Sequence, residues 1–267
     1  MTWAASPDPL WRAMQTLSII IVARNEAINI AECVRSARFA DEVIVLDSGS
    51  TDGTPELAGT EGAHVVQTDW PGYGPQNNRG IDLAAGDWFF SLDADERISP
   101  ELAAEIRKAI ERCDVNGFRV PRTSMYCGRF MQHGGWTPDY TRRLARRGKG
   151  RFTEHFLHAN LQIEGPTGSL RQPIIHYSYR SMEAVLEKMN RYSSASARDL
   201  TGAGRKGSLG RAIGHGLWAF FRTYVLRLGF LDGRFGFMLA VSNAEGTYYR
   251  YVKLWLMQQP EAADATP

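Results

Sequence analysis

The sequence of 267 residues has little cysteine, little net charge and no long apolar run. Its three cysteines, Cys33, Cys113 and Cys127, form no C-x-x-C pair and are odd in number, so we expect free thiols in a reducing compartment. No apolar run approaches the roughly 18–20 residues that span a bilayer. Residues 1–16 lack the basic segment and apolar core of a secretory signal. The net charge of +2 gives no reason to expect a nucleic-acid partner. These absences predict a cytoplasmic protein.

Short apolar runs alternate with helical patterns in the first half of the chain. The composition, 43% hydrophobic and 22% charged, is that of a globular protein. Helix signals include Thr54 as an N-cap before Pro55, and Ser99 before Pro100. Strands separated by such helices imply right-handed crossovers, so we predict an α/β fold with a mainly parallel central sheet. The predicted strands are 17–22, 42–46, 63–67, 88–92 and 117–120.

Polar side chains follow three of these predicted strands. Asp93 and Asp95 lie two residues apart after the fourth strand, a spacing that points both carboxylates the same way. Mg²⁺ binds one or two such carboxylates and fills its other positions with phosphate oxygens and water. Residues 24–26 follow the first strand, and Asp47 with Asp52 follows the second. Because ligands bind at the carboxyl ends of parallel strands, we expect the three clusters to meet in one crevice.

The second half of the chain changes character. Residues 122–150 are rich in glycine, arginine and aromatic residues without a clear period, and predict loops with a hairpin at 146–150. A helix is predicted at 181–200, followed by a small-residue linker at 202–208. Residues 209–259 are apolar and aromatic but contain several arginines. We expect an amphipathic, helical C-terminal region.

The apolar side chains of this region recur at helical spacing. Arg211 and Arg222 lie together on a different face. The pattern is typical of an interfacial helix whose basic side chains reach the headgroups, and equally of a helix docked on the catalytic domain. The predicted apolar face comprises Ile213, Leu217, Phe220, Tyr224 and Leu228.

Several segments resemble a known family. LSIIIVARNEA (17–27), VLDSGSTDGT (45–54) and SLDADERI (91–98) resemble the nucleotide-diphospho-sugar glycosyltransferases of family 2, which adopt the GT-A fold. A closer likeness is to lipopolysaccharide-core β-1,4-glucosyltransferases that act on inner-core heptose. It rests on TDWPGYGPQ (68–76), GRFMQHGGWTPD (128–139) and LDGRFGFMLAV (231–241).

The resemblance implies roles for individual residues at the donor site. Asp95 is expected to ligate Mg²⁺ or Mn²⁺, with Asp93 supporting it and contacting the ribose or the metal. Most family members have two adjacent acids before the Gly-Ser-Thr-Asp segment, whereas the second position here is Ser48. The base contact therefore becomes a hydroxyl contact or passes to Asp52. The other expected donor residues are Ala23, Arg24, Asn25 and Glu26 around the uridine, Asp47 at the nucleoside, and Asn78 and Arg79.

Family 2 enzymes invert the anomeric carbon in a single displacement, so a general base is needed for the acceptor hydroxyl. Asp139, in the segment Gly-Trp-Thr-Pro-Asp, is our first candidate, and Glu154 is the second. The structural alternative is that Asp139 caps a turn or pairs with Arg142 or Arg143.

The acceptor side is expected to include Trp136, His133, Arg142 and Arg143. Trp136 could stack on a sugar ring, although core packing is the commoner role of tryptophan. Six cations between residues 142 and 151 are typical either of a solvated hairpin or of attraction to an anionic acceptor or bilayer. The resemblance implies a nucleotide-sugar donor, UDP-glucose, and a lipid-linked saccharide acceptor. It also implies peripheral contact with the inner face of the cytoplasmic membrane.

Two alternatives remain open from the sequence. A polyprenyl-phosphate sugar synthase shares the N-terminal half, and residues 136–139 distinguish it. A non-catalytic nucleotide-sugar-binding protein is the other, while a hydrolase with paired carboxylates fits poorly. The expected organisation is a tail at 1–16, a nucleotide-sugar-binding half at 17–122, an acceptor-binding half of the same domain at 123–200, the C-terminal region at 201–259 and a tail at 260–267.

Overall fold

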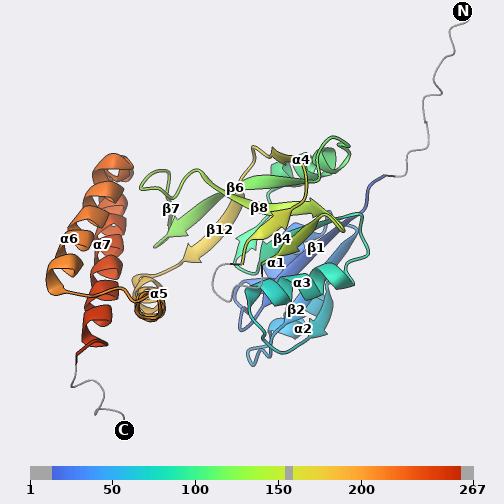
Figure 1. Ribbon diagram of the computed structural model, residues 1–267. Helices are drawn as coiled ribbons and strands as arrows, with labels where there is room; N and C mark the ends of the chain where they lie inside the picture. Colours follow the sequence, from blue (N-terminus) through green and yellow to red (C-terminus); the bar gives the residue numbers. More distant parts are fainter. Residues whose placement is uncertain (1–13, 154–158, 260–267) are drawn as a thin grey trace, which may run out of the picture. The chain divides into compact units, whose positions relative to one another are not determined.

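The computed structural model describes residues 14–153 and 159–259, and the chain forms two compact units (Figure 1). Each unit takes two separate segments of the chain. The first, here called the α/β unit, comprises Met1–Val120 and Thr141–Ile174. The second, here called the helical unit, comprises Pro121–Tyr140 and Ile175–Pro267. The chain first passes from the α/β unit to the helical unit between Val120 and Pro121.

Four parallel strands form the start of the sheet in the α/β unit. They are β1 (Leu17–Ala23), β2 (Glu42–Asp47), β3 (His64–Gln67) and β4 (Trp88–Asp93), in the order β3-β2-β1-β4. β1 pairs in parallel with β2 on one side and with β4 on the other. The predicted α/β class with a mainly parallel sheet is confirmed.

The sheet continues past β4 in the order β8-β6-β12-β5. The chain passes from one unit to the other within three of these strands, namely β6 (Gly117–Tyr126), β8 (Asp139–Arg146) and β12 (Ile174–Tyr179). The short strands are β5 (Glu96–Arg97), β7 (Arg129–Phe130), β9 (Gly150–Phe152), β10 (Leu161–Ile163) and β11 (Thr167–Ser169).

The predicted hairpin at 146–150 is wrong. Residues 146–150 do form a turn, but β8 pairs with β4 while β9 pairs with β10 in a separate two-stranded sheet. At Gly150, the first residue of β9, an added Cβ would come within 2.7 Å of the Ala145 side chain and 2.9 Å of Phe89. The absence of a side chain lets β9 lie directly against the sheet.

Three helices connect the four parallel strands: α1 (Ile30–Ala37), α2 (Thr54–Thr60) and α3 (Tyr73–Leu83). A fourth helix, α4 (Pro100–Ile110), follows β5 and leads to β6. The hydroxyl of Ser99 caps α4 by accepting the Leu102 N–H at 3.2 Å, as predicted. Thr54 is the first residue of α2 and not its cap. Gly53 occupies the cap position with a left-handed φ of +82°, a conformation that glycine adopts without strain.

Alternate residues of β1 pack into two separate hydrophobic cores. Ile19 and Ile21 join one cluster and Ile20 joins the other, because successive strand side chains point to opposite faces of the sheet.

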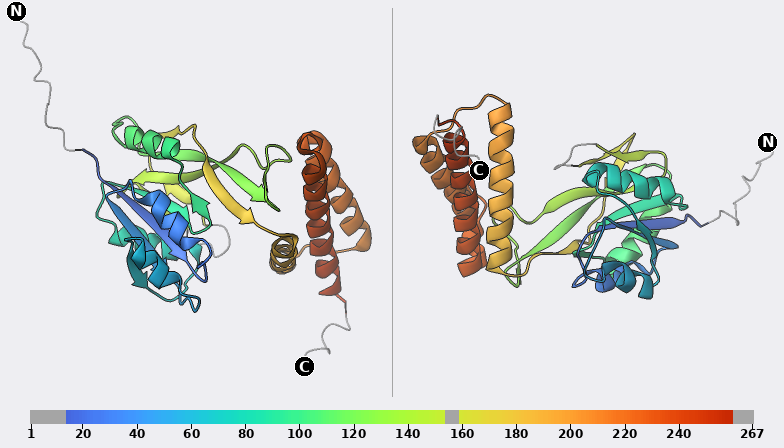
Figure 2. Two further views of the ribbon diagram at one scale, coloured as in Figure 1. Left: turned by 180° about the vertical axis from the view of Figure 1, so that it is seen from behind. Right: turned by 90° about the horizontal axis from the view of Figure 1, so that it is seen from below.

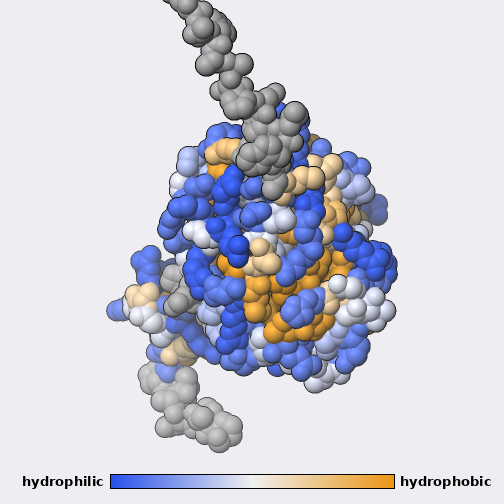
Figure 3. Space-filling view, turned by 90° about the vertical axis from the view of Figure 1, so that its right-hand side faces the viewer, coloured by the Kyte–Doolittle hydropathy of each residue, from blue (hydrophilic) through white to orange (hydrophobic). Residues whose placement is uncertain are grey.

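Hydrophobic side chains also reach the surface: the face drawn in Figure 3 is largely hydrophilic, with hydrophobic residues gathered in one area.

The helical unit contains α5 (Met182–Gly202), α6 (Leu209–Phe221) and α7 (Gly233–Leu256) (Figure 2). A π-helical turn η1 (Arg222–Leu226) and a 3₁₀ turn η2 (Gly229–Asp232) join α6 to α7. The core of this unit comprises Tyr126, Met131, Val185 and Leu239. Within residues 14–153 and 159–259, no helix has both the length and the apolar composition needed to cross a membrane.

Segment 209–231 exposes many large apolar side chains to solvent. Leu217 is 68% exposed and Leu226 is 55% exposed, and Arg211, Arg222 and Arg227 are exposed among them. The predicted apolar face is split, because Phe220 and Tyr224 instead contact Phe237 of α7. The other exposed apolar residues are Leu209, Ile213, Trp218, Phe221, Val225, Leu228, Phe230 and Leu231.

Candidate active site

The carboxyl ends of the first, second and fourth strands lie side by side in the α/β unit. Ala23 of β1 is the register partner of Asp47 of β2, and Val22 is the register partner of Asp93 of β4. The ends of the three strands therefore lie at one edge of the sheet, and the meeting of the three polar clusters in one crevice stays a prediction. The strand order changes direction around β1, which is where ligands bind in open α/β sheets.

Hydrogen bonds from backbone N–H groups to side-chain oxygens join the loop after β1 to the loop after β2. Asn25, whose φ is +54°, donates its N–H to the Ser50 hydroxyl at 2.8 Å and accepts the Thr51 N–H at 2.9 Å. The Glu26 N–H donates to the Thr54 hydroxyl at 2.8 Å. Asn25 and Glu26 thus help to fix the two loops. Arg24 is exposed beside them.

Asp47 and Asp52 both accept hydrogen bonds inside these loops. Asp47 is buried, and its carboxylate accepts the Gly49 and Ser50 N–H groups at 3.2 and 3.0 Å. Hydrogen bonds from the Thr54 hydroxyl at 2.6 Å and from the Ala27 N–H at 3.0 Å hold the pKa of Asp52 below its usual value. Both carboxylates stabilise the loops in which they lie.

Ser48, which stands where the family usually has a second acid, is buried against α3. Its hydroxyl accepts a hydrogen bond from the Gln76 side-chain amide at 3.0 Å. The same amide also donates to the Thr68 hydroxyl. The hydroxyl of Ser48 therefore ties the end of β2 to the start of α3.

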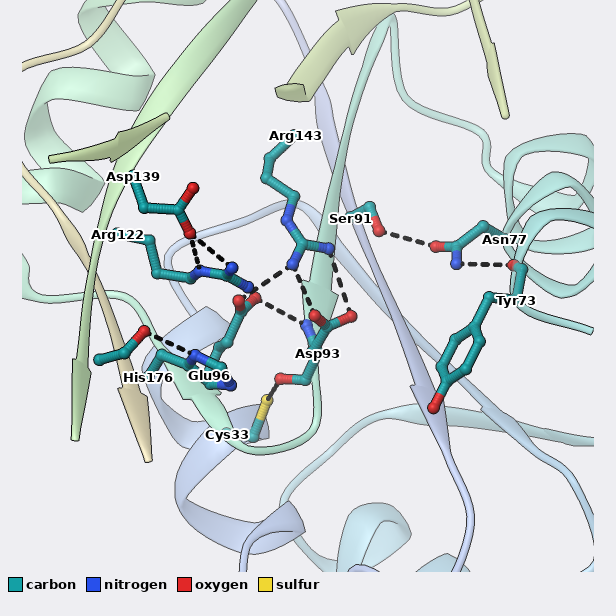
Figure 4. A network of polar contacts seen from close by, with 11 residues as sticks. Cys33, Tyr73, Asn77, Ser91, Asp93, Glu96, Arg122, Asp139, Arg143 and His176 are labelled. Carbon is teal, nitrogen blue, oxygen red and sulfur yellow. Dashed lines mark hydrogen bonds and ion pairs between the residues drawn. The ribbon is translucent and has the colours of Figure 1, made fainter. Parts of the chain in front are cut away.

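Arg143, a neighbour of Asp93 in the same unit, binds two carboxylates from the β4–β5 segment (Figure 4). Its guanidinium donates to Asp93 at 2.5 and 3.2 Å and to Glu96 at 3.0 Å. Arg143 and Glu96 are both buried. Burial lowers the pKa of the Arg143 guanidinium, but Asp93 and Glu96 outweigh this and raise it above its usual value. The arginine is therefore charged and holds Asp93 in place.

The backbone between Asp93 and Arg97 is also fixed. Arg97 is buried and donates to the carbonyl oxygens of Ala94 at 3.0 Å and of Asn29 at 2.8 Å. The Asp93 N–H donates to Glu96 at 3.0 Å. This loop carries Asp95, so Arg97, Arg143 and Glu96 together set the position of its backbone.

Asp95 is the residue that the sequence predicts as the ligand of a divalent cation, and its surroundings are acidic. Burial raises the pKa of the nearby Glu26 carboxyl, a hydrogen bond from Asn29 lowers it, and the charges of Asp95 and Asp52 raise it further. No group of three His, Cys, Asp or Glu side chains forms a ready metal cage among the described residues. Mg²⁺ needs no such cage when diphosphate oxygens and water complete its shell. One partly buried carboxylate in an acidic loop fits that requirement.

The two predicted donor residues of α3 make contacts within the α/β unit. The Asn78 side-chain amide donates to the Phe152 carbonyl at 3.0 Å and accepts the Phe152 N–H at 2.9 Å. Arg79 pairs with Asp69 at 2.5 Å. Their role at the donor stays a prediction. The adjacent Asn77 is buried and accepts the Ser91 hydroxyl at 2.7 Å.

The predicted general base lies in the helical unit. The Asp139 carboxylate accepts hydrogen bonds from Arg122 at 2.6 and 3.0 Å and remains 40% exposed. The ion pair expected with Arg142 or Arg143 is thus made by a residue of the neighbouring strand β6. Glu154, the second candidate, lies outside the described residues.

The predicted acceptor residues have different surroundings. Trp136 packs edge-on against Tyr126, with ring centres 5.7 Å apart, in the helical unit. In the same unit, the buried Asp232 accepts the His133 N–H at 2.8 Å, and the His133 ring nitrogen lies 3.2 Å from the same carboxylate. Arg142 is exposed, whereas Arg143 is buried in the network with Asp93. The structural roles of four charged residues could not be predicted, because charged side chains are normally solvated. They are Glu96, Arg97, Arg122 and Asp232.

Comparisons with known proteins agree with this architecture. A protein-family model described as glycosyl transferase family 2 matches residues 18–171. An uncharacterized glycosyltransferase of Rickettsia felis is 31% identical over 254 residues, which cover 90% of each chain. The lipopolysaccharide core biosynthesis glycosyltransferase LpsC of Rhizobium meliloti is 28% identical over 273 residues, covering 93% of this chain and 97% of LpsC.

Two solved structures show a weaker likeness. Glucosyl-3-phosphoglycerate synthase from Mycobacterium tuberculosis, in complex with Mn²⁺, UDP-glucose and phosphoglyceric acid, is 27% identical, with a TM-score of 0.36. The match covers 40% of this chain and 43% of that one. S. aureus TarS, in complex with UDP-GlcNAc, is 18% identical with a TM-score of 0.43 and covers 59% of each chain. From the family match and the full-length relatives, the chain belongs to glycosyl transferase family 2 and has the GT-A fold.

Proposed function

We propose that this glycosyltransferase transfers a hexose from a nucleotide sugar, UDP-glucose, to a lipid-linked saccharide of the lipopolysaccharide inner core, with inversion at the anomeric carbon. The observation that carries the donor side of this proposal is the register at the sheet edge. It brings the β1 loop, Asp47 and the Asp93–Asp95 segment to neighbouring positions. The acceptor side is supported by the likeness to a lipopolysaccharide core glycosyltransferase over 93% of the chain.

In this proposal the β1 and β2 loops bind the nucleoside and the β4 loop binds the diphosphate. The network of Arg143, Glu96 and Arg97 keeps the β4 loop rigid, so its carboxylates need not reorganise when the donor binds. Asp95 would hold a Mg²⁺ or Mn²⁺ ion, which offsets the negative charge of the departing diphosphate. Asp93 is the residue that would contact the ribose, or the metal if Arg143 releases it.

Asp139 is the proposed general base for the acceptor hydroxyl. It is an exposed carboxylate, and a base must reach within about 2.6–3.2 Å of the proton that it accepts. The two hydrogen bonds from Arg122 hold one carboxylate oxygen, Oδ2. The other oxygen, Oδ1, would then accept the proton as the hydroxyl attacks the sugar.

The exposed apolar side chains of segment 209–231 support a lipid-linked acceptor. Large exposed apolar surface bordered by arginine is the composition that enters the interface of an anionic bilayer. Leu217 and Trp218 are both more than half exposed, and Arg222 is exposed beside them. Contact with the membrane would bring the enzyme to a substrate that does not leave the membrane.

The donor side is tested by calorimetry. Purified protein is titrated with UDP-, GDP- and ADP-sugars, with Mn²⁺ and with a chelator. We expect one UDP-sugar to bind and its affinity to fall when the metal is removed. If none of the UDP-sugars binds, the assignment of uracil as the nucleobase of the donor is contradicted. That result would point to the hydroxyl of Ser48 as the reason for a different choice.

The membrane contact is tested by sedimentation with vesicles of phosphatidylcholine, with and without phosphatidylglycerol. Binding is expected to require the anionic lipid. Replacing both Leu217 and Trp218 by serine should weaken binding by about tenfold or more, given about 1.5–3 kcal/mol for each large apolar side chain buried. The matched control replaces two exposed leucines of the α/β unit, Leu57 and Leu83, by serine. Equal losses of vesicle binding in both double variants would contradict the assignment of the membrane contact to segment 209–231.

A further inference from the structure

The helical unit contains a cavity that the proposed transfer chemistry does not use. Its volume is about 370 Å³, within the range of about 300–1,000 Å³ typical of small-molecule sites. It lies between α5 and α7, with further walls from β6, β12 and the loop that carries Trp136. We call it the aromatic pocket, after the side chains of Tyr126, Trp136, Tyr179 and Tyr192 that line it.

Two cations line the aromatic pocket, and its described lining residues include no acid. Arg250 of α7 has a buried Nε that lacks a hydrogen-bond partner among the described residues. The Arg250 side chain also lines the pocket, so its positive charge would attract an anionic ligand bound there. Lys188 of α5 extends its ammonium over the ring of Tyr179, 4.8 Å from the ring centre. Both charges favour an anionic ligand.

The remaining wall of the pocket suits a polyhydroxylated ligand. The aromatic rings of Trp136 and Tyr179 line this wall together with the hydroxyl groups of Ser196 and Thr247. Burial raises the pKa of Tyr179 to about 12, so its phenol stays protonated and can donate a hydrogen bond. Apolar ring faces beside hydrogen-bonding groups match the alternating faces of a sugar ring.

Gly246 lets α5 pack closely against the middle of α7 at the wall of the pocket. An added Cβ there would lie 3.2 Å from the Met189 side chain on α5, and both residues line the pocket. Glycine inside a helix costs about 0.5–1 kcal/mol relative to alanine. The position is therefore explained by this close contact between the two helices and not by helix stability.

We propose that the aromatic pocket binds a sugar unit that carries a phosphate or carboxylate group, with Arg250 and Lys188 holding the anion. Such a unit would anchor the acceptor saccharide, and only this last step rests on the proposed function. Binding of the isolated anionic sugar does not depend on it.

The test measures binding of small probes without donor or metal. Purified protein is titrated with glucose 6-phosphate, glucuronate, glucose and inorganic phosphate, followed by calorimetry and by tryptophan fluorescence. We expect glucose 6-phosphate or glucuronate to bind about tenfold or more tightly than glucose and than inorganic phosphate, since a hydrogen bond to a charged group contributes about that factor. Tighter binding of glucose 6-phosphate indicates a phosphate ligand, and tighter binding of glucuronate indicates a carboxylate ligand.

Variants locate the binding in the pocket. Arg250→Gln and Lys188→Gln should each weaken binding of the anionic sugar by about tenfold, whereas Arg250→Lys should retain part of it. The matched control is Arg234→Gln, an exposed cation of the same helix outside the pocket, which should bind as the parent does. Thermal unfolding checks each variant. If Arg250→Gln does not fold, Lys188→Gln on the other helix carries the test.

Three results would overturn the inference: no binding by either anionic sugar, equal binding of inorganic phosphate, or equal binding of glucose. Equal losses in Arg234→Gln would also overturn it. Donor titration separates this inference from the proposed function. If anionic sugars bind and no nucleotide sugar does, the pocket assignment is supported and the proposed transfer is contradicted. If a nucleotide sugar binds and no anionic sugar does, the proposed transfer is supported and the pocket assignment is contradicted.

Discussion

Arg143 lies against Asp93, with its Nη2 atom 2.5 Å from the carboxylate Oδ2, and the same nitrogen lies 3.0 Å from Glu96. Glu96 is fully buried. One arginine on β8 therefore neutralises a buried acid and orients the first acid of the Asp93–Asp95 pair. This contact therefore fixes the geometry of the segment between β4 and β5.

Replacing Arg143 by methionine should destabilise the protein by about 3–5 kcal/mol, because Glu96 would be left buried without its partner. Urea unfolding followed by circular dichroism measures the change. Arg142→Met is the control, because Arg142 is the next residue and is exposed, and we expect its effect to stay within about 0.5 kcal/mol. Similar stabilities for the two variants would show that Arg143 does not compensate Glu96.

Asp95→Ala should abolish nearly all sugar transfer while the fold is retained. The carboxylate that we assign to the metal is lost, and with it the metal dependence of donor binding. Calorimetry of the UDP-sugar with and without Mn²⁺ is the direct measurement, with thermal unfolding as the check on folding. Asp114→Ala removes an exposed acid of the same unit and should leave transfer intact. Full activity of Asp95→Ala would rule out the metal assignment.

Asp139→Asn should lower kcat by about 10²-fold or more, since asparagine cannot accept the proton. Arg122→Gln should have a smaller effect, because it keeps the carboxylate and loses only the group that orients it. Single-turnover kinetics with the bound donor separates the chemical step from binding. An unchanged rate in Asp139→Asn would move the base role to Glu154.

Glu26→Gln should change how stability depends on pH. The folded protein raises the pKa of Glu26 by burial, so the folded state binds its proton more tightly than the unfolded state does. The contribution of Glu26 to the free energy of unfolding is complete below the pKa of the unfolded state, near 4.5. It is lost as the pH rises through the higher pKa of the folded state. The variant should therefore be more stable than the parent at pH 7, and the difference should shrink toward pH 4. Parallel unfolding curves at all pH values would contradict the prediction.

Gly80→Ala should destabilise the protein by about 1–3 kcal/mol. An added Cβ at Gly80 would lie 2.3 Å from the Ile20 side chain and 3.0 Å from Leu46, so α3 would have to move away from the sheet. Gly59→Ala is the matched control, because nothing lies within 4 Å of its added Cβ and it also stands in a helix. That variant should be neutral or slightly stabilised. The comparison by thermal unfolding needs no knowledge of activity.

The parallel strands and their shared edge could be predicted because their signals are local. A short run such as Leu17 to Val22 is buried on both faces, and parallel strands align their carboxyl ends. The role of Arg143 could not be predicted, because it stands in a run of six cations that is typical of a solvated surface. Only the strand geometry of β8 separates its inward-facing side chain from the exposed Arg142.

The predicted apolar face of the C-terminal region was wrong for a different reason. The helical spacing from Ile213 to Leu228 assumes one regular helix, but η1 is a π-helical turn that begins at Arg222. A π turn holds more residues than an α turn, so side chains beyond it rotate to another face. Tyr224, inside this turn, packs on Phe237, while Leu228, beyond it, reaches solvent. Phe220, before the turn, also contacts Phe237, whereas Leu217 of the same helix is exposed.

The interleaved course of the chain limits how the helical unit can be exchanged between relatives. A chimera that joins two parents at residue 174 would replace α5, α6 and α7 but keep segment 121–140 from the original parent. Tyr126 and Met131 of that segment share a core with Leu239 of α7. A single crossover would therefore combine core residues of segment 121–140 from one parent with core residues of α7 from the other. Exchange of the whole helical unit by recombination therefore requires three crossovers, at 120/121, 140/141 and 174/175.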